Sequence, residues 1–193
     1  MATGTSRYAW LVIRSPARLV PAPYPQRSDK MNEEQLIALI HHAFQEVPEP
    51  TKDSITGCTC GECTEIREDF AGKQPEDLNE DRMRFHSWDL GFFTPEARQY
   101  YLPGWMRLGI TQPKSNCTDA VIQVLGYSKG WDTPSGYTAV QREAIFEFLK
   151  LIKTRDGRCG ELEFDIAWDE WSTDPEPDPP NEESEQVVRC NRR

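Results

Sequence analysis

The sequence lacks the signatures of the common enzyme classes. It contains no glycine-rich phosphate loop, no G-x-S-x-G nucleophile elbow, no H-E-x-x-H zinc helix and no dinucleotide-binding glycine fingerprint. Adjacent carboxylates are abundant, but in so acidic a chain we expect most of them to be solvated surface groups. These absences favour a non-enzymatic protein over an enzyme.

Long hydrophobic runs are also missing. No stretch approaches the roughly 20 apolar residues that a membrane-spanning helix needs. The apolar segment 8–13 is too short and irregular to form the core of a signal peptide. We therefore expect a cytoplasmic protein whose six cysteines stay reduced unless a metal holds them.

Positive charge is scarce outside the first 30 residues. Those residues carry five basic groups and one acid, a net charge of +4, whereas the whole chain carries −10. Residues 31–193 therefore carry −14. A body this acidic repels nucleic acid and anionic membranes. It favours a basic partner, although the same charge also serves solubility alone.

The two ends differ in composition from the middle of the chain. Residues 1–31 are basic and rich in proline, which predicts either a disordered arm or a mis-called upstream extension with Met31 as the true start. Residues 172–193 begin with a run of acids and prolines that contains no basic residue before Val187. Because such a composition cannot bury enough surface to order itself, we expect a disordered acidic tail.

Between these ends, residues 32–171 predict a single compact, mainly α-helical domain of five or six helices. Capping boxes at Asn32–Gln35 and Thr138–Gln141 predict two of the helix starts, and Thr94-Pro95-Glu96 predicts another. Pro103 follows within that third helix, so we expect the helix to end or kink there. The predicted helices cover about 33–46, 62–70, 95 onward, 118–125, a stretch from 139, and 161–171, where helix is favoured over strand.

One cysteine cluster could carry chemistry. Cys60 and Cys63 have the two-residue gap of a zinc knuckle, in which both thiolates reach one ion. Cys58 lies too close to Cys60 in sequence to add easily, so His86 is a candidate further metal ligand, with Cys117 and Cys159 as alternatives. A structural zinc ion, a redox pair and plain thiols at a helix start, with no cofactor, all remain open.

Other polar and aromatic residues have two interpretations each. His86 and Asp89 could form an acid–base pair, although a histidine beside tryptophan is more often a hydrogen-bonded boundary residue. A set of aromatic residues could line a pocket, although helical spacing more often indicates core; these are Trp88, Tyr100, Tyr101, Trp105 and Trp131.

The chain resembles a family of small uncharacterised bacterial proteins, catalogued as a domain of unknown function. The similarity covers about Asn32 to Trp171. It is carried by C-G-E-C-T-E at 60–65, T-P-E-A at 94–97, Y-Y-L-P at 100–103 and the helix that follows Tyr137. The extra Cys58, the basic arm and the acidic tail depart from the family pattern. The resemblance implies a compact helical domain and supplies no activity.

Together these observations predict a non-enzymatic cytoplasmic binding protein with an acidic surface, for example an inhibitor of a basic partner. The alternative is a zinc-binding or thiol-redox protein that uses Cys60 and Cys63. No nucleic acid and no membrane is expected as a partner.

Overall fold

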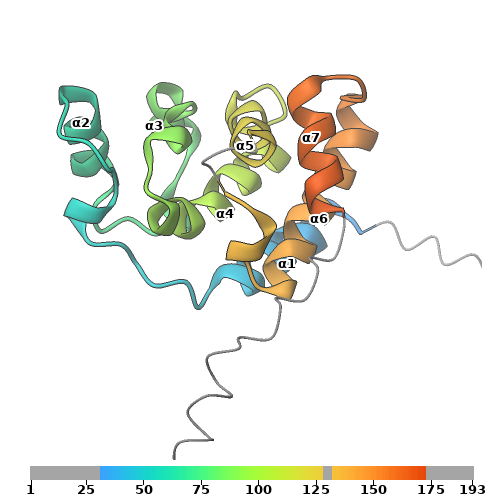
Figure 1. Ribbon diagram of the computed structural model, residues 1–193, viewed down its shortest axis with the longest axis horizontal. Helices are drawn as coiled ribbons and strands as arrows, with labels where there is room; N and C mark the ends of the chain where they lie inside the picture. The colour runs from blue at the N-terminus through green and yellow to red at the C-terminus, as the bar shows by residue number, and fades with distance from the viewer. Residues whose placement is uncertain (1–30, 128–131, 173–193) are drawn as a thin grey trace, which may run out of the picture. The chain divides into compact units, whose positions relative to one another are not determined.

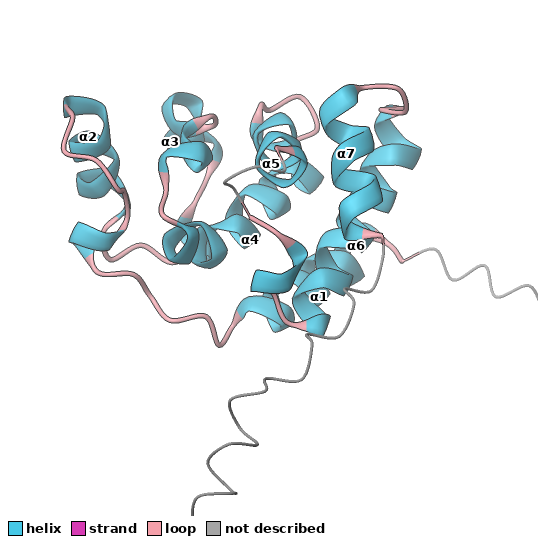
Figure 2. Cartoon of the chain, in the orientation of Figure 1, coloured by secondary structure: helices cyan, strands magenta, loops and turns pink. Residues whose placement is uncertain are grey.

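The computed structural model describes residues 31–127 and 132–172, so the expected arm, the acidic tail from Thr173 and Trp131 lie outside the described residues. Helices dominate what is described, as Figure 2 shows. The α-helices are α1 Glu33–Phe44, α2 Gly61–Phe70, α3 Glu80–His86, α4 Pro95–Thr111, α5 Cys117–Gly126, α6 Ala139–Asp156 and α7 Leu162–Trp171. Short 3-10 helices are η1 Lys52–Ser54, η2 Pro75–Asp77, η3 Asp89–Phe92 and η4 Pro134–Gly136.

This architecture confirms the expectation of a mainly α fold, but with seven α-helices in the described residues where five or six were expected. The additional helix is α3. Its only buried residue is Met83, and Phe85 is 80% exposed, so no apolar stripe marks it in the sequence. Asn79 starts α3 by accepting a hydrogen bond from the backbone N–H of Arg82.

Helix starts follow the cap residues in the sequence. Asn32 and Gln35 form a reciprocal capping box at α1, and Thr138 and Gln141 form another at α6. The Thr94 hydroxyl accepts the backbone N–H of Ala97 at 3.2 Å and starts α4. The expected helix at 161–171 is present as α7.

Helix α4 does not end at Pro103, as the sequence allowed, but continues to Thr111. Pro103 has no N–H to give to the carbonyl of Gln99, which removes one helical hydrogen bond. Twelve of the seventeen residues of α4 are buried. Burial on this scale, against α1, α5, η2 and η3, keeps the helix continuous across the proline.

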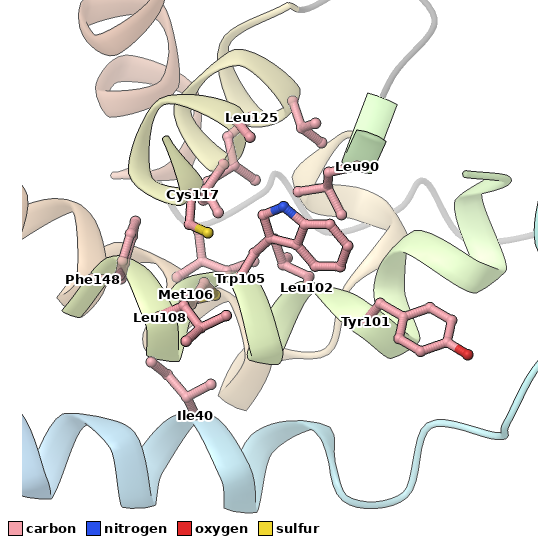
Figure 3. Packing of buried hydrophobic residues seen from close by; sticks show 14 of the residues in the cluster. Ile40, Leu90, Tyr101, Leu102, Trp105, Met106, Leu108, Cys117, Leu125 and Phe148 are labelled. Carbon is pink, nitrogen blue, oxygen red and sulfur yellow. The ribbon is translucent and has the colours of Figure 1, made fainter. Parts of the chain in front are cut away.

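Helix α4 (Figure 1) carries large side chains that form the centre of the hydrophobic core, and Figure 3 shows several of them. Trp105 and Tyr101 are fully buried, with Cys117 and Leu125 of α5 on one side of the helix and Ile40 of α1 on another. Their polar atoms are also satisfied. The Trp105 indole N–H donates to the carbonyl of Ser87 at 2.9 Å, and the Tyr101 hydroxyl donates to the carbonyl of Phe70 at 2.7 Å. The central helix thus fixes the ends of α2 and α3.

Next to Pro103, Gly104 lets the η2 segment approach α4. A Cβ atom at Gly104 would lie 2.5 Å from Leu78 Cδ1 and 2.7 Å from the carbonyl oxygen of Pro75. Three residues later Arg107 donates to the carbonyls of Pro75, Glu76 and Leu78. The Pro-Gly pair therefore belongs to a close contact between helix and turn.

Gly126 brings α5 and α7 together in the same way. A Cβ atom there would lie 2.1 Å from the carbonyl oxygen of Glu163 in the first turn of α7. The Trp171 indole N–H donates to the carbonyl of Leu125 at 3.3 Å at the other end of α7. The two helices are thus in backbone contact.

A buried polar cluster ties the start of α4 to the segment before α6. Asp132 accepts from Nε of Arg98 at 2.8 Å and from the hydroxyl of Tyr137 at 2.7 Å, and both side chains of the Arg98–Asp132 pair are 4% exposed. Burial, followed by the charge of Asp132, raises the pKa of Tyr137 above its usual range.

We predict that Gly126→Ala lowers the free energy of unfolding by about 1–3 kcal/mol, because the added methyl group collides with the backbone of α7. Urea denaturation followed by circular dichroism measures the change. Gly136→Ala is the control, since nothing lies within 4 Å of its Cβ position; we expect a change within about 0.5 kcal/mol. Equal stability of the two variants would contradict the close contact.

Tyr137 also predicts a pH dependence. Its raised folded pKa means that stability is fully present below the unfolded tyrosine pKa of about 10 and is lost as the pH rises above it. Tyr137→Phe should make this alkaline fall in unfolding free energy shallower. At pH 7 the variant should be less stable by about 1–3 kcal/mol, because Asp132 loses a donor. Urea titrations between neutral and alkaline pH test both expectations.

Candidate metal centre

Three cysteine sulfurs meet at the start of α2. Cys58 lies in the loop before the helix, Cys60 is its N-cap residue and Cys63 lies in its first turn. The Sγ atom of Cys58 is 2.8 Å from those of both Cys60 and Cys63, and all three lie within 4.8 Å of one another. The structure thus places Cys58 inside the cluster, against the expectation that it stands too close to Cys60 to join.

The loop reaches this position because its flank is anchored to the start of α4. Thr56 forms an antiparallel bridge with Phe93. Thr94 donates its backbone N–H to the carbonyl of Ile55 at 2.9 Å and its hydroxyl to the carbonyl of Ser54 at 2.7 Å. The chain then turns back at Gly57, and the thiols converge on the helix N-terminus.

Arg67, one helical turn beyond Cys63, holds the loop before α2 through hydrogen bonds. Its guanidinium donates to the carbonyl of Cys58, to the Thr56 hydroxyl at 2.7 Å and to the Thr64 hydroxyl at 3.0 Å. The Thr56 hydroxyl in turn donates to the carbonyl of Cys63 at 3.2 Å. A fixed positive charge therefore lies beside Cys58, where it adds to the lowering of the pKa of that thiol.

The three thiols differ in burial. Cys63 is 2% exposed, whereas Cys58 and Cys60 are exposed. Burial, followed by contacts with the other two thiols, raises the pKa of Cys63 to about 12. Hydrogen bonds with Cys60 and then with Cys63 lower the pKa of Cys58. The cluster thus pairs an exposed thiol whose pKa is lowered with a buried thiol whose pKa is raised.

The distance between the sulfurs is longer than in a disulfide and shorter than between two thiolates bound to one zinc ion. In a zinc tetrahedron with bonds of about 2.3 Å, neighbouring thiolates are about 3.8 Å apart. In a disulfide the two sulfurs are about 2.05 Å apart. From 2.8 Å, either geometry requires sulfur movements of about 1 Å or less, and Cys58 and Cys60 can supply them because they are exposed.

The other candidate ligands lie elsewhere. Cys117 is buried in α5 and Cys159 is exposed between α6 and α7. His86 lies between two carboxylates, with Nδ1 at 2.7 Å from Asp89 and Nε2 at 2.9 Å from Asp69. Among the described residues, the group of metal-ligating side chains contains Cys58, Cys60 and Cys63 but not His86.

His86 joins three elements through its ring. Asp69 is near the end of α2, His86 closes α3, and Asp89 starts η3, while the Phe70 ring packs edge-on against the imidazole at 5.2 Å. The pairing of His86 with Asp89 agrees with the sequence interpretation. Because both ring nitrogens face carboxylates, neither is open to a substrate. The ring thus connects α2, α3 and η3.

The aromatic residues divide between core and surface. Tyr101 and Trp105 are fully buried and Tyr100 is 6% exposed, so these three belong to the core. Trp88 is 49% exposed.

In the part of the chain that the structure describes, no helix is both long and apolar enough to cross a membrane.

Sequence reasoning found Cys60 and Cys63 but missed Cys58, Arg67 and Asp69. A spacing rule for zinc knuckles counts the two-residue gap and disregards a cysteine that is only two positions away. Arg67 and Asp69 carry no local signal, because their partners are 11 and 17 residues distant.

Comparison with known proteins agrees with the sequence resemblance. A family model described as a family of unknown function, DUF6714, matches residues 32–166. No curated protein matches the chain, and no solved structure does.

For His86, we predict that substitution by alanine lowers the free energy of unfolding by about 1–3 kcal/mol, because Asp89 is left without its donor. Its carboxylate is only 14% exposed, so water replaces the lost hydrogen bond poorly. His42→Ala is the matched control on the exposed side of α1, with an expected change within about 0.5 kcal/mol. A neutral effect of His86→Ala would show that the two carboxylates are not held by this ring.

Proposed function

The chain belongs to the family DUF6714, whose description names no activity, and we propose from the geometry of its cysteine cluster that it binds a zinc ion. The ligands of this site are the thiolates of Cys58, Cys60 and Cys63. The single observation that carries the proposal is the convergence of three sulfurs within 4.8 Å on one helix start.

The number of thiols favours a metal over a redox pair. A disulfide joins two sulfurs and leaves the third without a partner, whereas a metal ion uses all three. Thiolates are soft ligands, and zinc takes them in a tetrahedron. The redox alternative keeps its own support, because Cys58 is equidistant from two partners and its pKa is lowered.

The surroundings of the cluster suit such an ion. Three thiolates and one Zn²⁺ carry a net charge of about −1, which the nearby guanidinium of Arg67 offsets. The hydrogen bond from the Thr56 hydroxyl to the carbonyl of Cys63 orients the backbone that carries the ligands, a role that outer contacts commonly have in metal sites. Among the described residues no fourth side chain joins the trio, so water or an external ligand completes the tetrahedron.

We predict that protein purified without a histidine tag contains about one zinc per chain, measured by elemental mass spectrometry. Cys58→Ser, Cys60→Ser and Cys63→Ser should each strongly reduce this ratio, because two thiolates hold zinc much less tightly than three. Cys159→Ser is the matched control, since that thiol is exposed and far from the cluster in the fold. His86→Ala should also leave the zinc ratio unchanged.

Other outcomes separate the alternatives. Protein without zinc that also fails to take up added zinc contradicts the proposal. If mild oxidation of that protein joins Cys58 to Cys60 or Cys63, identified by peptide mapping, the thiol-redox function replaces it. Loss of zinc in His86→Ala without loss of fold would restore His86 as a ligand.

A second proposal concerns the acidic surface. We propose that the protein acts in the cytoplasm as a non-enzymatic binding protein for a basic partner protein. The net charge of −14 on residues 31–193 supports it, since a field of this sign steers cationic partners to the surface and repels nucleic acid.

A further inference from the structure

A pocket of about 280 Å³ lies at the surface, bordered by the segment before η3, by α5 and by the start of α7. Its lining combines aromatic and charged side chains. The aromatic and apolar members are Trp88, Ile122 and Tyr127, and the charged members are Asp119, Arg158, Glu161 and Glu163.

The two aromatic residues of this pocket are half exposed, Trp88 at 49% and Tyr127 at 50%, whereas most other large aromatics among the described residues form the core. Their positions are fixed by the fold. Trp88 precedes η3, which packs against α5, and Tyr127 is the first residue after α5. The backbone contact between Gly126 and Glu163 places Tyr127 beside the first turn of α7.

Negative charge is in excess around these rings. Of the described residues that line the pocket, Arg158 is the one cation, and it is already paired with Asp119 and with Glu161, the latter at 3.1 Å. Glu163 forms no ion pair within the described residues. Three carboxylates against one guanidinium leave two negative charges at a pocket with aromatic walls.

From this combination we propose that the pocket binds an arginine side chain of the basic partner. The inference rests on the second proposal above, that the protein binds such a partner, and it assigns the place of binding. A guanidinium stacks on an aromatic ring and pairs with a carboxylate through its planar fork, whereas the compact ammonium of lysine does neither as well. Trp88 supplies the ring, and Glu163 supplies the carboxylate.

The test uses the full chain and three synthetic peptides, hexa-arginine, hexa-lysine and hexa-citrulline, with affinities measured by isothermal titration calorimetry at low salt. Hexa-arginine should bind more tightly than hexa-lysine, and hexa-citrulline should not bind. Glu163→Gln and Trp88→Ala should each weaken hexa-arginine binding at least about fivefold. Trp88→Ala should also remove the preference for arginine over lysine.

Glu143→Gln is the charge-matched control, because Glu143 is an exposed acid on α6 outside this pocket. We expect it to bind hexa-arginine like the wild type, and thermal melts should show that all variants remain folded. If the wild type binds hexa-arginine but Glu163→Gln and Trp88→Ala bind equally well, the pocket assignment is wrong while the basic-partner proposal survives. If the wild type binds no cationic peptide, both are wrong. Equal affinity for hexa-lysine overturns the choice of arginine.

Discussion

Two side-chain-to-backbone hydrogen bonds from α4, those of Tyr101 to the carbonyl of Phe70 and of Trp105 to the carbonyl of Ser87, hold the end of α2 and the end of α3 on the central helix. Both donors are buried, so breaking either bond would leave polar atoms without water to replace it. The cysteine cluster lies at one end of α2 and the His86 ring at the other. The geometry of both sites therefore depends on how α4 is buried.

The sites of the two proposed functions lie on different helices of the domain. The cysteine loop is fixed by contacts with the start of α4, through Thr56 and Thr94. The aromatic pocket is formed by α5, α7 and the segment before η3, with Gly126 setting the distance between the two helices. Each site thus combines a helix end with a neighbouring loop that carries part of the site.

Sequence patterns predicted those features whose cause is local. Asn32, Thr94 and Thr138 start helices through hydrogen bonds that close within three residues, so their chemistry is visible in the sequence. Helix α3 was missed because it buries only Met83. The continuity of α4 through Pro103 depends on burial against four other elements, which no local rule contains. The pairing of His86 with Asp69 likewise joins residues 17 apart.

The bridge between Thr56 and Phe93 limits how much of the fold a bound metal would stabilise. This bridge already closes the segment 57–92, which contains the three cysteines together with α2 and α3. A metal on Cys58, Cys60 and Cys63 would close only a short loop of its own, and short loops cost the unfolded chain little entropy to close. The metal would therefore stabilise mainly the residues next to the three cysteines. Removing such an ion would release the few residues around the thiols, while the core around Trp105 would keep its packing.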